Sequence, residues 1–146
     1  MTPRESLRTK YEQDLETLQQ LEDYLNESCS ICAQLDVNAL SRKHLREIGA
    51  PTVRFQRAQD FFISHILRTV DALTGESGTT LDVLDRAEQR GIISSTSDFL
   101  DRRSLRNRIA HEYAGYGPMD IVQDILRYSP ILLDAVSKAR SFHIPE

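Results

Sequence analysis

The stretch 105–113 combines residue types that can carry chemistry. Asn107 and His111 are four residues apart, so on a helix they share a face and can hydrogen-bond. Arg106 and Tyr113 are seven apart and share a stripe. Arg106 and His111 are five apart, which separates them by about 140° around a regular helix. The reach of arginine, a loosening of the helix near His111 or a two-fold interface would each bring them together, and the spacing leaves all three open.

An arginine beside a histidine suits phosphoryl chemistry. A guanidinium holds a phosphate by two parallel hydrogen bonds and offsets the charge that develops in a transition state. Imidazole titrates near neutral pH and can act as a general acid or base. RNA cleavage by attack of the 2′-hydroxyl needs these ingredients and no metal. The same residue types also cap the C-terminal carbonyls of a helix, and the spacing alone favours that structural interpretation.

The run from Arg106 to Tyr113, Arg-Asn-Arg-Ile-Ala-His-Glu-Tyr, resembles the signature of HEPN-domain ribonucleases. The tyrosine two residues after the histidine resembles the HepT-like toxin branch in particular. The resemblance implies a metal-independent endoribonuclease without a cofactor, acting as a homodimer on RNA (an mRNA or a tRNA). It assigns phosphate binding to Arg106, acid–base catalysis to His111, and orientation of His111 or phosphate contact to Asn107.

The resemblance also implies a partner, a minimal nucleotidyltransferase antitoxin that attaches AMP to Tyr113. A bulky anion there would block the RNA cleft and repel phosphates. A single chain offers one histidine in the stretch, and a symmetric dimer would supply the second acid–base group. The alternative is a non-catalytic helical binding module that serves as an adaptor for a nucleotidyltransferase or another partner.

The charge of the chain excludes a protein that coats nucleic acid by bulk electrostatics. The 146 residues carry a formal net charge of −4, whereas such proteins are strongly basic. The only lysines are Lys10, Lys43 and Lys138, so fifteen of the 18 basic residues are arginines. Arg102, Arg103 and Arg108 surround Arg106, and we predict that these three contact the RNA backbone. An RNA-binding role is therefore expected to be local.

The elements that must position these residues are all predicted to be helices, because no stretch alternates in the manner of a strand. A helix over 4–27 is predicted from apolar residues at three- and four-residue steps, namely Tyr11, Leu15, Leu18, Leu21 and Leu25. A second helix begins at a cap, Asp36 or Asn38, and ends at Gly49-Ala50-Pro51. A third follows Thr52, with a buried stripe of Phe55, Phe62, Ile66, Val70 and Leu73. Whether the second and third form one kinked helix stays open.

Three further helices follow the loop Gly75–Gly78. Thr80 is predicted to cap a short one that ends at Gly91, with Leu81, Leu84 and Ala87 facing inward. Ser95 and Asp98 resemble a capping box for the helix that carries the motif and runs to about Tyr113. The last helix starts after Pro118 and is expected to bend at Pro130; its apolar residues are Ile121, Val122, Ile125, Leu126, Leu132 and Val136. The prediction is one all-α domain over 1–146, an antiparallel bundle of four or five helices that forms a two-fold dimer.

Other candidate sites are weaker. Cys29 and Cys32 form a lone CxxC, which we interpret as small buried thiols at a helix end rather than a metal or redox site. His65 is predicted to pack in the core or an interface, and His44 and His143 to lie on the surface. The acidic residues of the first helix are predicted to form its solvated face: Glu12, Asp14, Glu16, Glu22, Asp23 and Glu27. Two cysteines and no apolar run near ~18 residues predict a cytoplasmic protein without a membrane span.

Overall fold

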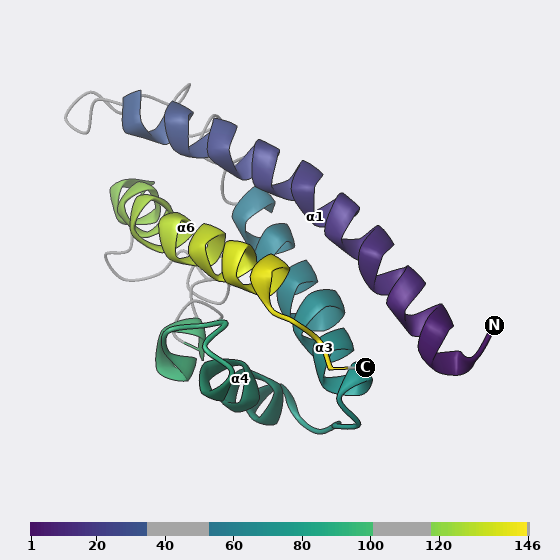
Figure 1. Cartoon of the computed structure of the whole chain (residues 1–146). Coiled ribbons are helices and arrows are strands. Elements are labelled where there is room, and N and C mark those ends of the chain that lie inside the picture. The colour runs from purple at the N-terminus through teal and green to yellow at the C-terminus, as the bar shows by residue number, and fades with distance from the viewer. Residues whose placement is uncertain (35–52, 101–117, 146) are drawn as a thin grey trace.

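The computed structural model describes residues 1–34, 53–100 and 118–145, and these residues are helices joined by loops, with no strand among them (Figure 1). The prediction of an all-α chain is confirmed for this part of the sequence. The elements are α1 (Pro3–Gln34), the π-helix η2 (Phe62–Leu67), α3 (Arg68–Leu73), α4 (Thr80–Gln89) and α6 (Pro118–Ser141). Residues 53–61 and 96–100 are also helical. The predicted second helix and the Thr52 cap lie outside the described residues.

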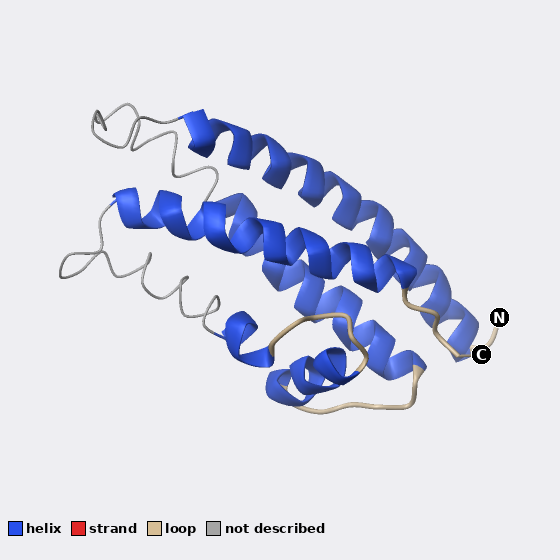
Figure 2. Cartoon of the chain, turned by 60° about the vertical axis from the view of Figure 1, so that its left-hand side comes forward, coloured by secondary structure: helices blue, strands red, loops and turns tan. Residues whose placement is uncertain are grey.

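Three long helical segments pack side by side: α1, the segment 53–73 and α6. Helix α1 runs antiparallel to the other two segments (Figures 1 and 2). Helix α1 contacts α6, η2 and α3. Segment 53–73 and α6 run in the same direction, so the packing is not antiparallel throughout. The guanidinium of Arg4 donates to the carbonyls of Leu73 and Pro145, and this joins the start of α1 to the end of α3 and to the C-terminal tail. The number of helices and the two-fold dimer stay predictions.

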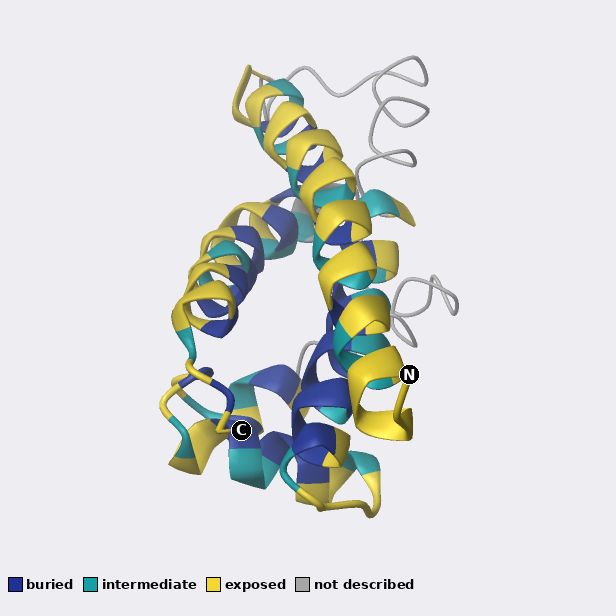
Figure 3. Cartoon of the chain, turned by 45° about the vertical axis from the view of Figure 1, so that its right-hand side comes forward, coloured by how far each residue is buried: buried dark blue, intermediate teal, exposed yellow. Residues whose placement is uncertain are grey.

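Helix α1 is longer than the predicted span of 4–27 and continues to Gln34. Four of its five buried residues recur every seven positions, at Tyr11, Leu18, Leu25 and Cys32; the fifth is Ser28. A seven-residue step brings a helix back close to the same face, so the apolar stripe extends through the CxxC segment. The predicted span ended at residue 27 because its stripe ran from Tyr11 to Leu25 and did not include Cys32. Figure 3 shows the outer face of this helix exposed.

Segment 53–73 forms the centre of the core. All five residues of the predicted stripe, from Phe55 to Leu73, are buried, which confirms the prediction. Residues 62–67 form a π-helix, in which the backbone N–H of Arg68 donates to the carbonyl of Ile63, five residues earlier. Such a turn widens the helix, and it occurs where Phe62, Ile63, Ile66 and Leu67 are all buried.

The N-cap of α4 is Thr79, not Thr80 as predicted. The hydroxyl of Thr79 accepts from the N–H of Asp82, and the carboxylate of Asp82 accepts from the N–H of Thr79, which makes a complete capping box. The prediction for Leu81 is also wrong: it is 49% exposed, and Val83 is buried in its place. Helix α4 ends at Gln89, and Gly91 follows with a φ of +75°, which confirms the predicted glycine stop.

Both helices that flank the motif begin where the sequence predicts. The N–H of Asp98 donates to the Ser95 hydroxyl at 3.3 Å, which is the forward half of the predicted cap. Helix α6 starts at Pro118 and continues through Pro130. Its predicted apolar residues Val122, Ile125, Leu132 and Val136 are buried, but Leu126 is 37% exposed and lies outside the core. The side chain of Ile121 lies outside the described residues.

The acidic residues of α1 do not all lie on a solvated face. Four of them are exposed as predicted, namely Glu12, Glu16, Asp23 and Glu27. The side chain of Glu22 is only 14% exposed and pairs with Arg140 of α6. The side chain of Asp14 is 15% exposed and faces His65 of η2. These two carboxylates lie at the contacts of α1 with its neighbouring helices, where side chains are shielded from water.

Candidate functional site

The residues of the predicted catalytic motif lie outside the described residues. The following positions fall in 101–117: Arg102, Arg103, Arg106, Asn107, Arg108, His111 and Tyr113. The structure describes the two helical segments that precede and follow them. Phe99 is fully buried, and its ring packs against that of Phe62 with centroids 6.1 Å apart. The chain therefore enters the motif from a helix anchored in the core and leaves it at the start of α6.

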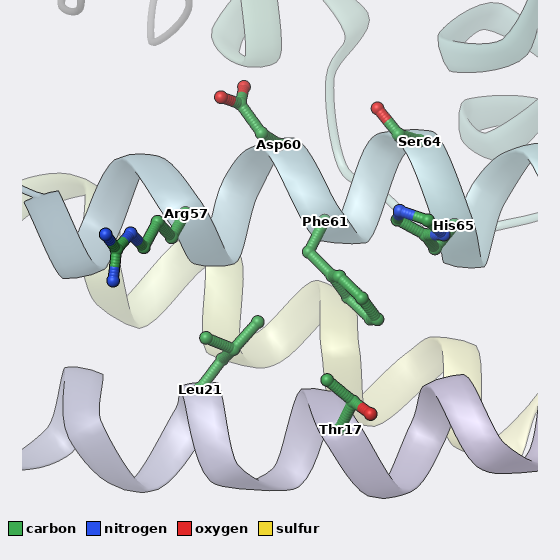
Figure 4. A pocket seen from close by; sticks show the side chains of 7 residues that line it. All are labelled: Thr17, Leu21, Arg57, Asp60, Phe61, Ser64 and His65. Carbon is green, nitrogen blue, oxygen red and sulfur yellow. The ribbon is translucent and has the colours of Figure 1, made fainter.

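A groove lies between α1 and the segment 57–65 (Figure 4). Its volume is about 410 Å³, within the usual range for sites that take small molecules. Seven residues line it: Thr17, Leu21, Arg57, Asp60, Phe61, Ser64 and His65. Figure 4 shows Thr17 and Leu21 on α1 pointing towards Phe61, and Asp60 and Ser64 on the side of the facing helix turned away from α1.

An aromatic pair forms the wall of this groove. The rings of Phe61 and His65 stack with centroids 4.5 Å apart and an interplanar angle of 24°. Arg57 lies one turn earlier on the same stripe, because 57, 61 and 65 are four residues apart. Sequence reasoning treated His65 only as a packing or interface residue and missed the groove. The signal was the regular spacing of a cation, a phenyl ring and an imidazole.

His65 of the groove also faces a carboxylate of α1. Its Nδ1 lies 3.9 Å from Oδ2 of Asp14, an ion pair when the imidazole is protonated. That carboxylate oxygen is buried and has no hydrogen-bond partner among the residues that the structure describes. The His65 side chain itself is 43% exposed. The imidazole therefore lies partly against Phe61 and partly in solvent, and the prediction that it packs is confirmed only in part.

The strongest charge cluster of the described residues is structural. Asp71 is 1% exposed, and its carboxylate accepts from Arg86 at 2.9 and 2.6 Å and from Arg90 at 2.5 Å. The hydrogen bond to Asp71 raises the pKa of the Arg86 guanidinium. Arg90 also donates to the Thr74 hydroxyl at 2.8 Å. Because Asp71 belongs to α3 and Arg86 to α4, the cluster joins these two helices.

The two cysteines lie on the last turns of α1 and are free thiols. Cys32 is buried, which confirms the packing interpretation, whereas Cys29 is half-buried. Burial, followed by the neighbouring Cys29, raises the pKa of the Cys32 thiol to about 11. Within residues 1–34, 53–100 and 118–145, no group of three or more His, Cys, Asp or Glu side chains is placed to hold a metal ion. His143 is exposed as predicted, and His44 lies outside the described residues.

Comparison of the chain with models of protein families, with curated proteins and with solved structures finds no match. None of the described helices is both long and apolar enough to cross a membrane.

Proposed function

We propose that this protein is a metal-independent endoribonuclease toxin of the HEPN type, which acts as a homodimer on an mRNA or a tRNA. The observation that carries the proposal is the motif Arg106-Asn107-x3-His111-x-Tyr113. Two features of the described structure agree with it. The chain is helical on both sides of the motif, and Phe99 anchors the preceding helix in the core.

The chemistry follows from the residue types. His111 of one subunit takes the proton from a ribose 2′-hydroxyl, and the 2′-oxygen then attacks the adjacent phosphorus. The bond from phosphorus to the 5′-oxygen breaks, and a second histidine, from the symmetric subunit, gives that oxygen a proton. Arg106 neutralises the charge that gathers on the phosphoryl oxygens, and Asn107 orients His111. The products are a 2′,3′-cyclic phosphate and a 5′-hydroxyl, and no metal is required.

Arg102, Arg103 and Arg108 are proposed to hold the RNA backbone on either side of the cut. The partner is proposed to be a minimal nucleotidyltransferase antitoxin that transfers AMP to Tyr113. The added phosphodiester carries a negative charge and a bulky nucleoside two residues from His111. Charge repulsion and steric exclusion of RNA would then silence the enzyme.

The proposal is tested by incubating purified protein with RNA in EDTA. The wild type is expected to cut the RNA, and the His111→Ala variant is expected to cut at least about a hundredfold more slowly, because it lacks the general acid–base group. His143→Ala serves as the matched control, since His143 is exposed and lies outside the motif. Mass spectrometry of each preparation shows whether Tyr113 carries AMP.

Equal cleavage by the wild type and His111→Ala would refute the assignment of His111. Absence of cleavage by wild-type protein free of AMP would instead favour the non-catalytic binding module. Far-ultraviolet circular dichroism of each variant, compared with the wild type, establishes that the helices have formed.

A further inference from the structure

We propose that the groove between α1 and the segment 57–65 binds a nucleotide, with the base stacked on the Phe61–His65 pair and the phosphate held by Arg57 (Figure 4). This site is separate in sequence from the motif around His111. The proposal does not depend on catalysis by His111 and goes beyond the proposed ribonuclease activity.

The aromatic pair supplies the surface that a base requires. Phe61 and His65 already stack on each other at 4.5 Å, so their rings are held in a defined orientation before a ligand arrives. With its side chain 43% exposed, His65 leaves part of its ring open to the groove. Thr17 and Leu21 of α1 face the pair from the opposite wall (Figure 4). Stacking of a base on aromatic side chains is tolerant of base identity, because every base has a π-face.

The charges of the groove place the phosphate at one end. Arg57 is exposed and lies two turns before His65 on the same helical stripe. Two carboxylates are nearby: Asp14 faces His65 at the other end, and Asp60 lies on the side turned away from α1 (Figure 4). A phosphate at Arg57 is thus farthest from Asp14, and a guanidinium binds a phosphate by paired hydrogen bonds.

The backbone of the groove gives a second, independent indication. Ser64 and His65 belong to the π-helix η2. π-turns are rare and occur frequently at functional sites. Here the wide turn follows Phe61 directly and contains its stacking partner, so it determines how the aromatic pair faces α1.

The nucleotide has two chemical sources, a free mononucleotide or an internal nucleotide of single-stranded RNA. Two probes separate them: uridine 5′-monophosphate, and a fluorescein-labelled single-stranded oligouridylate followed by anisotropy. All measurements use the full chain carrying His111→Ala, so that cleavage does not consume the RNA. With His111 replaced, three of the four histidines of the chain remain, and they give few imidazole signals in an NMR spectrum. The His65 signal is identified by its loss in His65→Gln.

Phe61→Leu is expected to weaken binding of the oligouridylate about tenfold, since it keeps an apolar side chain but removes the stacking ring. Arg57→Gln should weaken binding and reduce its dependence on salt. Arg127→Gln is the matched control, because Arg127 is an exposed arginine of α6 that does not line the groove. The His65 signal should shift during titration. A shift with both probes identifies a free nucleotide as sufficient, and a shift with the oligouridylate alone identifies RNA.

The proposal is overturned when neither probe binds, or when Phe61→Leu and Arg57→Gln bind as tightly as Arg127→Gln. Should Phe61→Leu fail to fold, as judged by circular dichroism, the comparison of binding by Arg57→Gln and Arg127→Gln still tests the proposal, because Arg57 is exposed. The result is also distinct from a failure of the proposed ribonuclease, which is judged by cleavage. Binding at the groove without any RNA cleavage would support this inference and contradict the other.

Discussion

At the scale of single residues, Asp71 is a buried charge surrounded by fixed partners. Its carboxylate is almost free of solvent contact and accepts three hydrogen bonds from two guanidinium groups. A carboxylate in this position is stabilised only while its partners remain, because removing either side leaves an uncompensated charge away from water. The cluster therefore contributes to the contact of α3 with α4.

Replacing Asp71 by Asn tests that role. The amide keeps the shape but removes the charge and turns an N–H towards the arginines, so the free energy of unfolding should fall by about 3–5 kcal/mol. Urea unfolding followed by circular dichroism measures the change. Asp134→Asn is the control, because the side chain of Asp134 is 57% exposed and pairs with Lys138 one turn away; its loss should cost under about 1 kcal/mol. Equal effects of the two substitutions would contradict the structural role of Asp71.

Cys32 is a second residue whose surroundings determine its chemistry. Burial raises the pKa of its thiol from an ordinary value of 9.0 to about 11. The folded protein thus holds the thiol proton more tightly than the unfolded chain. The stabilisation is complete below pH 9 and is lost as the pH rises towards 11.

The urea midpoint of the wild type should therefore fall between pH 9 and pH 10. Cys32→Ala should weaken that dependence. Cys29→Ala, which alters the half-buried thiol, should retain most of it, because burial of Cys32 is the larger cause of the raised pKa. In the folded protein a thiol reagent is expected to modify Cys29 before Cys32 at pH 8. Faster modification of Cys32 than of Cys29 would show that its thiol is accessible and ionised.

At the scale of the elements, the contribution of the α4 capping box to the free energy of unfolding can be measured. Thr79→Ala removes the acceptor for the N–H of Asp82 and should lower the free energy of unfolding by about 1 kcal/mol. The hydrogen bond from the backbone N–H of residue 79, followed by the Thr79 side chain, lowers the pKa of the Asp82 carboxyl. Alanine keeps the backbone N–H, so Thr79→Ala should retain most of the pH dependence that Asp82 gives to the free energy of unfolding. A carboxyl with a lowered pKa stabilises the fold above its unfolded pKa and loses that effect as the pH falls.

Thr9→Ala is the control for this substitution. Thr9 is exposed within α1, and its hydroxyl donates to the carbonyl of Glu5 one turn earlier. Alanine has the higher helix propensity there, so stability should be unchanged or slightly higher. A loss at Thr9 as large as the loss at Thr79 would contradict the capping account.

The positions of the helices followed from the sequence, but their ends and their packed faces did so only in part. Apolar periodicity predicted the buried stripe from Phe55 to Leu73 because burial imposes that spacing. The observed N-cap of α4 could also have been predicted from the sequence. Thr79 and Asp82 have the spacing of a capping box, whereas the residue three positions after Thr80 is Val83. The π-helix was not readable, because its wider turn depends on packing against α1 and α4. The groove could not be predicted from the sequence either, since it forms only when α1 is placed opposite Phe61.

At the scale of the whole molecule, the acidic net charge and the proposed RNA chemistry are compatible. The exposed acidic residues of α1 account for part of the charge of −4, while four arginines lie within residues 102–108. A chain of this kind is expected to engage few phosphates and to bind RNA with modest affinity. Because each neutralised phosphate adds to the salt dependence of binding, that dependence should be shallow. The sequence predicted this arrangement of charge, but the geometry of the motif residues lies outside the described structure and stays a prediction.

The most direct test of the central claim is to identify the ends that form when wild-type protein, free of AMP on Tyr113, acts on a short RNA in EDTA. Attack by the 2′-hydroxyl predicts a 2′,3′-cyclic phosphate and a 5′-hydroxyl by mass spectrometry, and no cleavage of the same sequence made with 2′-deoxyribose. Cleavage of the deoxy strand, or cleavage that appears only when a divalent metal is added, would contradict the account.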